Sequence, residues 1–256
     1  MSTTRGAAVR STTALVLAGC SLVAWIVTVV YALDRPAAPG TMGLGVLQFL
    51  GLWTVMMAAM MLPSISPLVS LYVRRIRSEQ SARSRTLRTG ALVAGYLTTW
   101  AGFGLVAFVL ARLGGELASR APDVAPWVGA VALATAGVYQ LTPLKDFCLS
   151  HCRSPVSFLL HFGSLKGRTR DFQVGLRHGA FCVGCCWGLM VVLIVVGIMS
   201  LGWMAAIAAA VLLEKTWRHG RTLSRALGVA LVVLALFVPS HPELLPGLHE
   251  TMPMSM

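Results

Sequence analysis

Apolar residues along this chain form long runs, separated by short polar segments that carry most of the charge. An apolar run of about 20 residues is long enough to cross a bilayer as a helix. The pattern predicts such helices at residues 13–33, 44–62, 90–111, 125–142, 180–199, 203–217 and 223–238. We therefore expect an all-α fold, a polytopic membrane bundle of about seven transmembrane helices.

The longest segment between two of these runs is residues 143–180. It contains a shorter apolar stretch, VSFLLHFGSL at 156–165, for which we expect a short helix lying in the membrane interface. His161 is interpreted as a polar group on that helix. By organisation the chain divides into an N-terminal helix and outer loop, a metal-binding membrane domain and an outer tail, at residues 1–43, 44–238 and 239–256.

The positive charges predict the topology. Eighteen of the 21 Lys and Arg residues fall in segments on one side, with two before the first helix, six in 74–88, six in 145–177 and four in 215–225. The other side holds only Arg35, Arg112 and Arg120. Because Lys and Arg accumulate in cytoplasmic loops, we expect the N-terminus inside, the C-terminus outside, and a multi-pass protein of the inner (plasma) membrane.

Composition agrees with a membrane protein and argues against a nucleic-acid partner. The chain is 56% hydrophobic and 12% charged, about half the charged fraction of a soluble domain. A net charge of +12 would suggest nucleic acid if taken alone. Because the charges lie in loops between apolar runs, we assign them to topology and to contact with lipid head groups instead.

The strongest candidate for chemistry is RHGAFCVGCCWGLM at residues 177–190, where a basic loop meets an apolar run. In a helix, positions three and four apart share a face. One face then carries imidazole, thiol and thioether groups, from His178, Cys182, Cys185, Cys186 and Met190. This soft ligand set favours Cu(I) and, with fewer sulfurs, zinc.

A second thiol pair lies in the 143–180 segment. Cys148 and Cys152 are four residues apart, and His151 follows Cys148 by three. If this stretch is helical, both thiols and the imidazole lie on one side of it. We therefore include these three residues among the candidate metal ligands.

Methionines are concentrated where the second predicted helix ends. Four of the six residues 56–61 are Met, and Pro63 and Pro67 are expected to break or kink the chain after them. We interpret Met57, Met60 and Met61 as candidate thioether ligands, with core packing as the alternative. The outer tail is also rich in such groups and is either a copper-receiving segment or a plain disordered end, with His241, His249, Met252, Met254 and Met256.

The motifs together resemble the family of predicted metal-binding integral membrane proteins, some of which are copper chaperones for a bacterial tyrosinase-type polyphenol oxidase. The matching motifs are MMAAMMLP at 56–63, CLSHCRSP at 148–155, GLRHG at 175–179, CVGCCW at 182–187 and LEK at 213–215. The resemblance implies metal binding, a copper cargo and a copper-dependent client enzyme.

Two other functions fit the same cysteines. Cys-x3-Cys followed by Cys-x2-Cys resembles a four-thiolate zinc site that would pin the 143–180 segment to the next helix. The spacing Cys182-x-x-Cys185 is also that of a membrane thiol oxidoreductase. The sequence has no H-E-x-x-H, phosphate loop or serine nucleophile elbow, so we expect no enzyme. Glu214 is expected to pair with Lys215 or Arg218.

Overall fold

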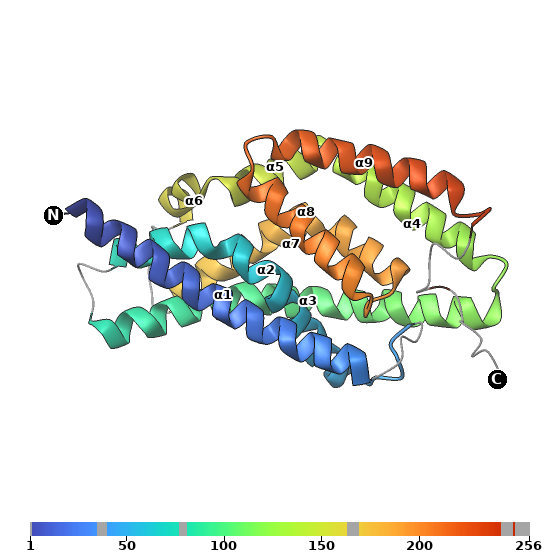
Figure 1. The fold of residues 1–256 in the computed structure, drawn as a ribbon, viewed down its shortest axis with the longest axis horizontal. Helices are drawn as coiled ribbons and strands as arrows, with labels where there is room; N and C mark the ends of the chain where they lie inside the picture. The colour runs from blue at the N-terminus through green and yellow to red at the C-terminus, as the bar shows by residue number, and fades with distance from the viewer. Residues whose placement is uncertain (1, 35–39, 77–80, 163–168, 242–247, 249–256) are drawn as a thin grey trace.

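All regular elements in the described part of the chain are helices, which confirms the all-α prediction (Figure 1). The computed structural model describes residues 2–34, 40–76, 81–162, 169–241 and 248. The elements are α1 (Ser2–Asp34), α2 (Val46–Ile76), α3 (Ala82–Arg120), α4 (Ala125–Gln140), α5 (Pro143–Arg153), α6 (Pro155–Phe162), α7 (Arg170–Val196), α8 (Leu201–Thr216) and α9 (Gly220–Phe237). Apart from His241, the His and Met residues of the predicted tail lie outside the described residues.

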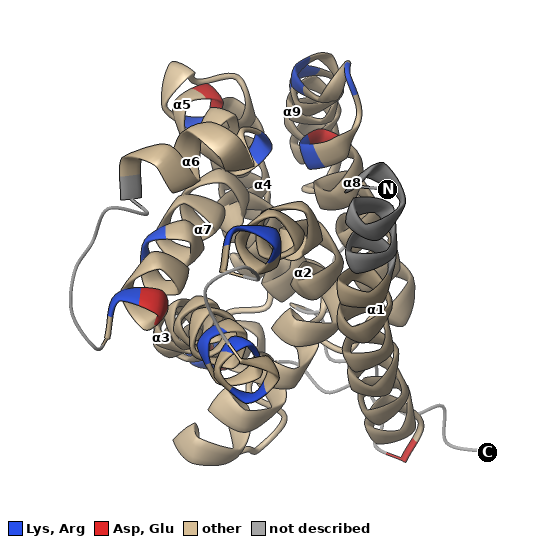
Figure 2. Cartoon of the chain, turned by 90° about the vertical axis from the view of Figure 1, so that its left-hand side faces the viewer, with Lys and Arg blue, Asp and Glu red and all other residues tan. Residues whose placement is uncertain are grey.

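The long helices run back and forth along one axis, so that α1 begins at one end of the bundle and α9 finishes at the other (Figure 1). Lys and Arg residues gather at the end where α2 finishes and where α3, α7 and α9 begin (Figure 2). This distribution is the one that the charge pattern predicts for an inner face. The orientation in a membrane, with the N-terminus inside, remains a prediction.

Five helices are long and apolar enough to cross a membrane, and the pair α4 and α5, bent by 63°, would make a sixth. The helix α8 has 16 residues, which span roughly 24 Å at about 1.5 Å per residue. That length is short of a hydrocarbon core of about 30 Å. The predicted number of seven crossings therefore remains a prediction.

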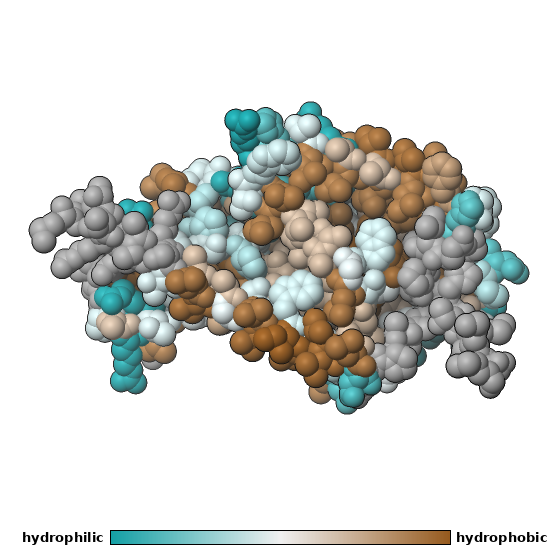
Figure 3. All heavy atoms as spheres, in the orientation of Figure 1, coloured by the Kyte–Doolittle hydropathy of each residue, from teal (hydrophilic) through white to brown (hydrophobic). Residues whose placement is uncertain are grey.

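The surface of the bundle is apolar over large areas, including α1 and the paired helices α4 and α9 (Figure 3). On α1 the side chains of Leu15, Leu22 and Val30 are each at least 60% exposed. Apolar patches of this extent are rare on soluble monomers and common on faces that contact lipid or another protein.

The prediction that the second helix ends at residue 62 is wrong, because α2 continues to Ile76 with Pro63 and Pro67 inside it. A proline cannot donate to the carbonyl four residues earlier. The carbonyl of Ala59, freed by Pro63, accepts a hydrogen bond from Ser21 Oγ of α1 at 2.6 Å. The carbonyl of Pro63, freed by Pro67, accepts one from Ser66 Oγ at 2.9 Å. The methionine cluster therefore lies within α2, not at its end.

The helices α3 and α7 are longer than predicted and pack closely on each other. A side chain on Gly175 would collide with the carbonyl of Leu92, and one on Gly95 with the carbonyl of Phe172. Small residues at such positions let two helix backbones approach. Because α7 begins ten residues before the predicted start at 180, His178 lies inside the helix.

Candidate metal centre

Three thiols of α7 form the core of the candidate site. The sulfurs of Cys182, Cys185 and Cys186 all lie within 4.8 Å of one another, and their residues are at most 1% exposed. Helical spacing places residues three and four apart on one face, so α7 alone produces this grouping. Among the described residues it is the one cluster of His, Cys, Asp or Glu side chains dense enough to hold a metal ion.

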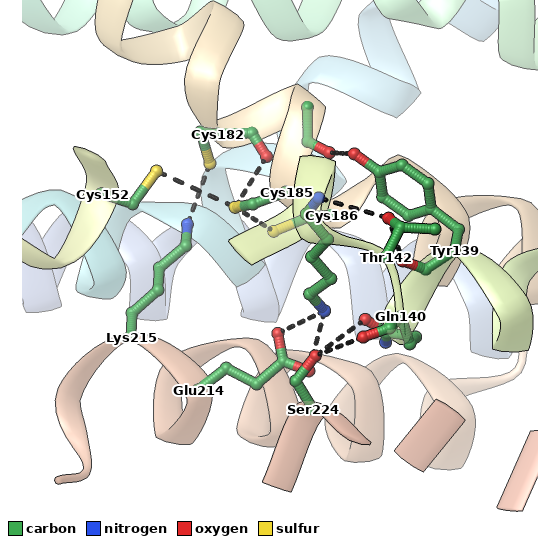
Figure 4. Close-up of polar contacts among 12 residues, drawn as sticks. Tyr139, Gln140, Thr142, Cys152, Cys182, Cys185, Cys186, Glu214, Lys215 and Ser224 are labelled. Atoms are coloured by element: carbon green, nitrogen blue, oxygen red, sulfur yellow. Dashed lines mark hydrogen bonds and ion pairs between the residues drawn. The ribbon is translucent and has the colours of Figure 1, made fainter. Parts of the chain in front are cut away.

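A fourth thiol comes from α5. The sulfur of Cys152 lies 3.8 Å from that of Cys185, and the sulfurs of Cys185 and Cys186 are 3.2 Å apart (Figure 4). The helix α5 begins at Pro143, with Thr142 Oγ1 accepting a hydrogen bond from the amide of Lys145 as an N-cap. The partly buried Cys152 therefore adds a fourth sulfur beside the three buried ones, and all four residues are free thiols. We call these four cysteines the four-thiol site.

Two polar side chains approach the sulfur of Cys182. Nζ of Lys215, on α8, donates to it at 2.9 Å and to Ser64 Oγ of α2 at 3.1 Å. The hydroxyl of Tyr96, on α3, lies 3.0 Å from the same sulfur. A buried ammonium group needs a partner of opposite charge or several acceptors. Cys182 is thus the thiol whose surroundings best stabilise a thiolate.

A buried ion pair joins α5 to α8. Nζ of Lys145 lies 2.8 and 3.0 Å from the two carboxylate oxygens of Glu214, and both side chains are at most 1% exposed. The expectation that Glu214 pairs with Lys215 or Arg218 is therefore wrong. Consecutive residues of a helix point about 100° apart, so Lys215 faces the thiols (Figure 4). Glu214, its neighbour, is directed to Lys145 instead.

The guanidinium of Arg153 ties the same two helices together. It donates to the backbone carbonyl of Glu214 and, at 3.4 Å, to that of Arg218. The carbonyl of Glu214 lies in the last turn of α8 and that of Arg218 just beyond its end, where backbone acceptors have no partner within the helix. The contact fixes the end of α5 that carries Cys152 against the end of α8 that carries Lys215.

Cys148 and His151 of α5 do not belong to the clustered thiols and make other contacts. The sulfur of Cys148 faces Gly184, where an added side chain would meet it at 2.9 Å. Nδ1 of His151 lies 2.9 Å from the carbonyl of Phe147, and its ring stacks on Phe181 with centroids 4.3 Å apart. The sequence predicts that both thiols and the imidazole of α5 converge. Of these three groups, the sulfur of Cys152 is the one that contacts the thiols of α7.

The remaining predicted ligands are buried near the site. His178 is 3% exposed, and its Nδ1 has no hydrogen-bond partner among the described residues. Met57, Met60 and Met61 are at most 2% exposed. They precede Ser64, whose hydroxyl donates to the carbonyl of Met61 at 2.8 Å and accepts from Lys215. Met60 and Met61 thus lie within about one helical turn of a residue that touches the site, and Met57 lies about two turns from it.

Sequence reasoning missed Lys215, Tyr96 and Ser64 as parts of the site. A lysine at the end of an apolar helix is a signal that can be read from sequence, because an intramembrane charge needs a partner. Nothing local in the sequence marks Tyr96 or Ser64, which reach the thiols only through packing of α3 and α2.

Comparison with known proteins gives one family. Residues 50–238 match the family PpoB2, described as a copper chaperone. Searches of curated proteins and of solved structures yield no significant match. The matched region contains the four thiols, Tyr96 and the end of α8. Because the match covers well over half of the 256 residues, the chain belongs to the PpoB2 copper chaperone family.

Proposed function

We propose that this protein is a multi-pass protein of the inner (plasma) membrane that binds Cu(I) at the four-thiol site and delivers it to a copper-dependent client enzyme. The observation that carries the proposal is the buried group of Cys182, Cys185 and Cys186, with Cys152 beside Cys185, in a chain of a copper chaperone family. Within the chain, residues 44–238 would form the metal-binding domain.

The chemistry of the site favours Cu(I). Soft thiolate ligands suit Cu(I), zinc and iron–sulfur clusters, and the copper chaperone family favours Cu(I) among them. Two or three thiolates around one Cu(I) leave a net negative charge, which is costly in a buried place. The ammonium group of Lys215, 2.9 Å from Cys182, offsets that charge without taking a coordination position.

Release needs weaker ligands beyond the thiols. Cu(I) passes between sulfur ligands by exchange, and thioethers bind it without a negative charge. Met57, Met60 and Met61 would supply such a path through α2. A client such as a polyphenol oxidase would receive the ion on the outer side, where the His and Met residues of the tail are predicted to lie.

Structural zinc is the second candidate, because four thiolates are also a zinc ligand set. In that case the metal would pin α5 to α7 and contribute directly to stability. The four-thiolate zinc site expected from the sequence includes Cys148, but the sulfur of Cys148 faces Gly184. A zinc site here would have to use both Cys185 and its neighbour Cys186.

A thiol oxidoreductase is less well supported. Thiol–disulfide exchange requires an attacking thiolate to reach the disulfide. Cys182 and Cys185 are at most 1% exposed, so a protein dithiol has no direct access to them.

Metal analysis of the purified, reduced protein tests the proposal. The wild type is compared with a triple variant, Cys182→Ser, Cys185→Ser and Cys186→Ser, and with the matched control Cys20→Ser, an exposed thiol on α1. The proposal predicts stoichiometric copper in the wild type and control, and none in the triple variant. Stoichiometric zinc, with an unfolded triple variant, would favour the structural zinc site.

A further inference from the structure

A cavity of about 530 Å³ lies between α5 and α6, outside the four-thiol site. Its wall includes two histidines, His151 from α5 and His161 from α6. Most of its other polar lining is serine hydroxyl, from Ser150, Ser154 and Ser157. The hollow therefore combines two imidazoles and three hydroxyls with the apolar side chains of Phe158 and Leu160. We call it the α5–α6 cavity.

Two pairs of neighbouring residues connect the lining of the α5–α6 cavity with the four-thiol site. His151 directly precedes Cys152, whose sulfur is 3.8 Å from that of Cys185. On the other side, Phe158 lines the cavity and packs edge-on against the ring of His178, with centroids 4.9 Å apart. His178 lies one helical turn before Cys182 on the same face of α7.

His151 and His178, one from each pair, each have a ring nitrogen available to a metal. Nδ1 of His151 lies 2.9 Å from the carbonyl of Phe147, an acceptor, so Nδ1 carries the proton and Nε2 keeps a lone pair for a metal. Nδ1 of His178 is buried with no hydrogen-bond partner among the described residues. An unpaired buried polar atom is costly unless a ligand or an ion visits it.

Ligand strength increases from the cavity toward the cluster. The cavity offers imidazoles, which bind copper less tightly than thiolates do. Cys152 follows as the least buried of the four thiols, and Cys182, Cys185 and Cys186 lie deepest, at most 1% exposed. A Cu(I) ion that reaches the imidazoles therefore moves inward toward tighter binding.

We propose that the α5–α6 cavity is the acquisition site, where His151 and His161 take Cu(I) from a soluble donor and pass it to Cys152 and the thiols of α7. This inference rests on the proposed function. In the transfer step a Cu–N bond breaks, a Cu–S bond forms and copper stays Cu(I), while the proton of the incoming thiol moves to the imidazole nitrogen that copper leaves. The histidines set the rate of loading, whereas the thiols set the affinity.

Stopped-flow loading from the coloured Cu(I)–bicinchoninate complex tests this under anaerobic conditions. The full-length double variant His151→Phe and His161→Gln is compared with the wild type, because phenylalanine can keep the stacking on Phe181. His219→Gln, an exposed histidine outside the cavity, is the matched control. We expect loading of the double variant to slow by about tenfold or more, with unchanged final copper content, Cu(I) affinity and helix content.

Three results would overturn the proposal in distinguishable ways. An unchanged loading rate in the double variant would remove the cavity from the path while leaving Cu(I) binding intact. A lowered final copper content with native helix content would make the histidines permanent ligands instead of transient ones. A wild type that takes no copper from the complex would overturn the proposed function itself.

Discussion

The ammonium nitrogen of Lys215 lies 2.9 Å from the sulfur of Cys182. The two residues come from different helices, α8 and α7, and both are buried. A cation at this distance stabilises a thiolate and, after metal binding, the negative charge of a copper–thiolate group. The candidate site therefore includes the ammonium group of Lys215 as well as the sulfur atoms.

Replacing this lysine should weaken copper binding. Lys215→Met keeps the apolar stem and removes the charge, so we expect the Cu(I) dissociation constant to rise by about tenfold or more, the effect of losing one charge-assisted hydrogen bond. Competition with a Cu(I) chelator measures the constant. Arg221→Met, which removes an exposed charge from α9, is the control. Equal affinities in both variants and the wild type would show that Lys215 has no part in the site.

The two cysteines of α5 should behave differently. Cys152→Ser removes a sulfur 3.8 Å from Cys185 and should lower Cu(I) affinity by about tenfold, the order expected for a lost ligand interaction of about 1.4 kcal/mol. Cys148→Ser, four residues earlier on the same helix, should leave the affinity unchanged. The same chelator competition checks both. Loss of affinity or of folding in Cys148→Ser would instead point to the zinc ligand set predicted from sequence.

Thioether participation can be tested with a substitution that conserves volume. Met60→Leu is expected to cost less than about 1.5 kcal/mol of stability, while removing the sulfur. If Met60 belongs to the copper path, transfer from loaded protein to an acceptor chelator should slow and less copper should be bound. Met204→Leu, equally buried on α8, is the control. Identical transfer rates for the two variants would assign the methionines of α2 to packing.

The continuation of α2 through Pro63 should depend on Ser21. Ser21→Ala leaves the buried carbonyl of Ala59 without its hydrogen bond and should cost about 1 kcal/mol of unfolding free energy. In a Pro63→Ala background the new amide N–H supplies that bond, so Ser21→Ala should cost much less there. Unfolding in detergent across the four combinations gives the coupling energy. If the two substitutions changed the unfolding free energy additively, the amide of residue 63 would not replace the hydroxyl of Ser21 as donor to Ala59.

How far the sequence predicts this protein depends on whether a feature is local. The grouping of Cys182, Cys185 and Cys186 follows from spacing on one helix and is predictable. The choice of Cys152 over Cys148 as fourth thiol depends on how α5 is rotated against α7. That rotation is fixed by contacts such as Arg153 with the end of α8, which no local pattern reveals.

The helix boundaries show the same limit. Pro63 and Pro67 predict a helix end because proline has no backbone N–H to complete the series of helical hydrogen bonds. The serine that completes it at Ala59 comes from α1, 38 positions earlier. Likewise Lys215 is a visible charge at the end of an apolar run, but its partners Cys182 and Ser64 lie on two other helices.

X-ray absorption at the copper edge of the Cu(I)-loaded protein tests the central claim most directly, because it reports the atoms bound to the metal. The account predicts an edge typical of Cu(I) and a first shell of sulfur only, which is lost in the Cys182→Ser, Cys185→Ser, Cys186→Ser variant and kept in Cys20→Ser. A first shell dominated by nitrogen or oxygen, or a sulfur shell that survives in the triple variant, would contradict it.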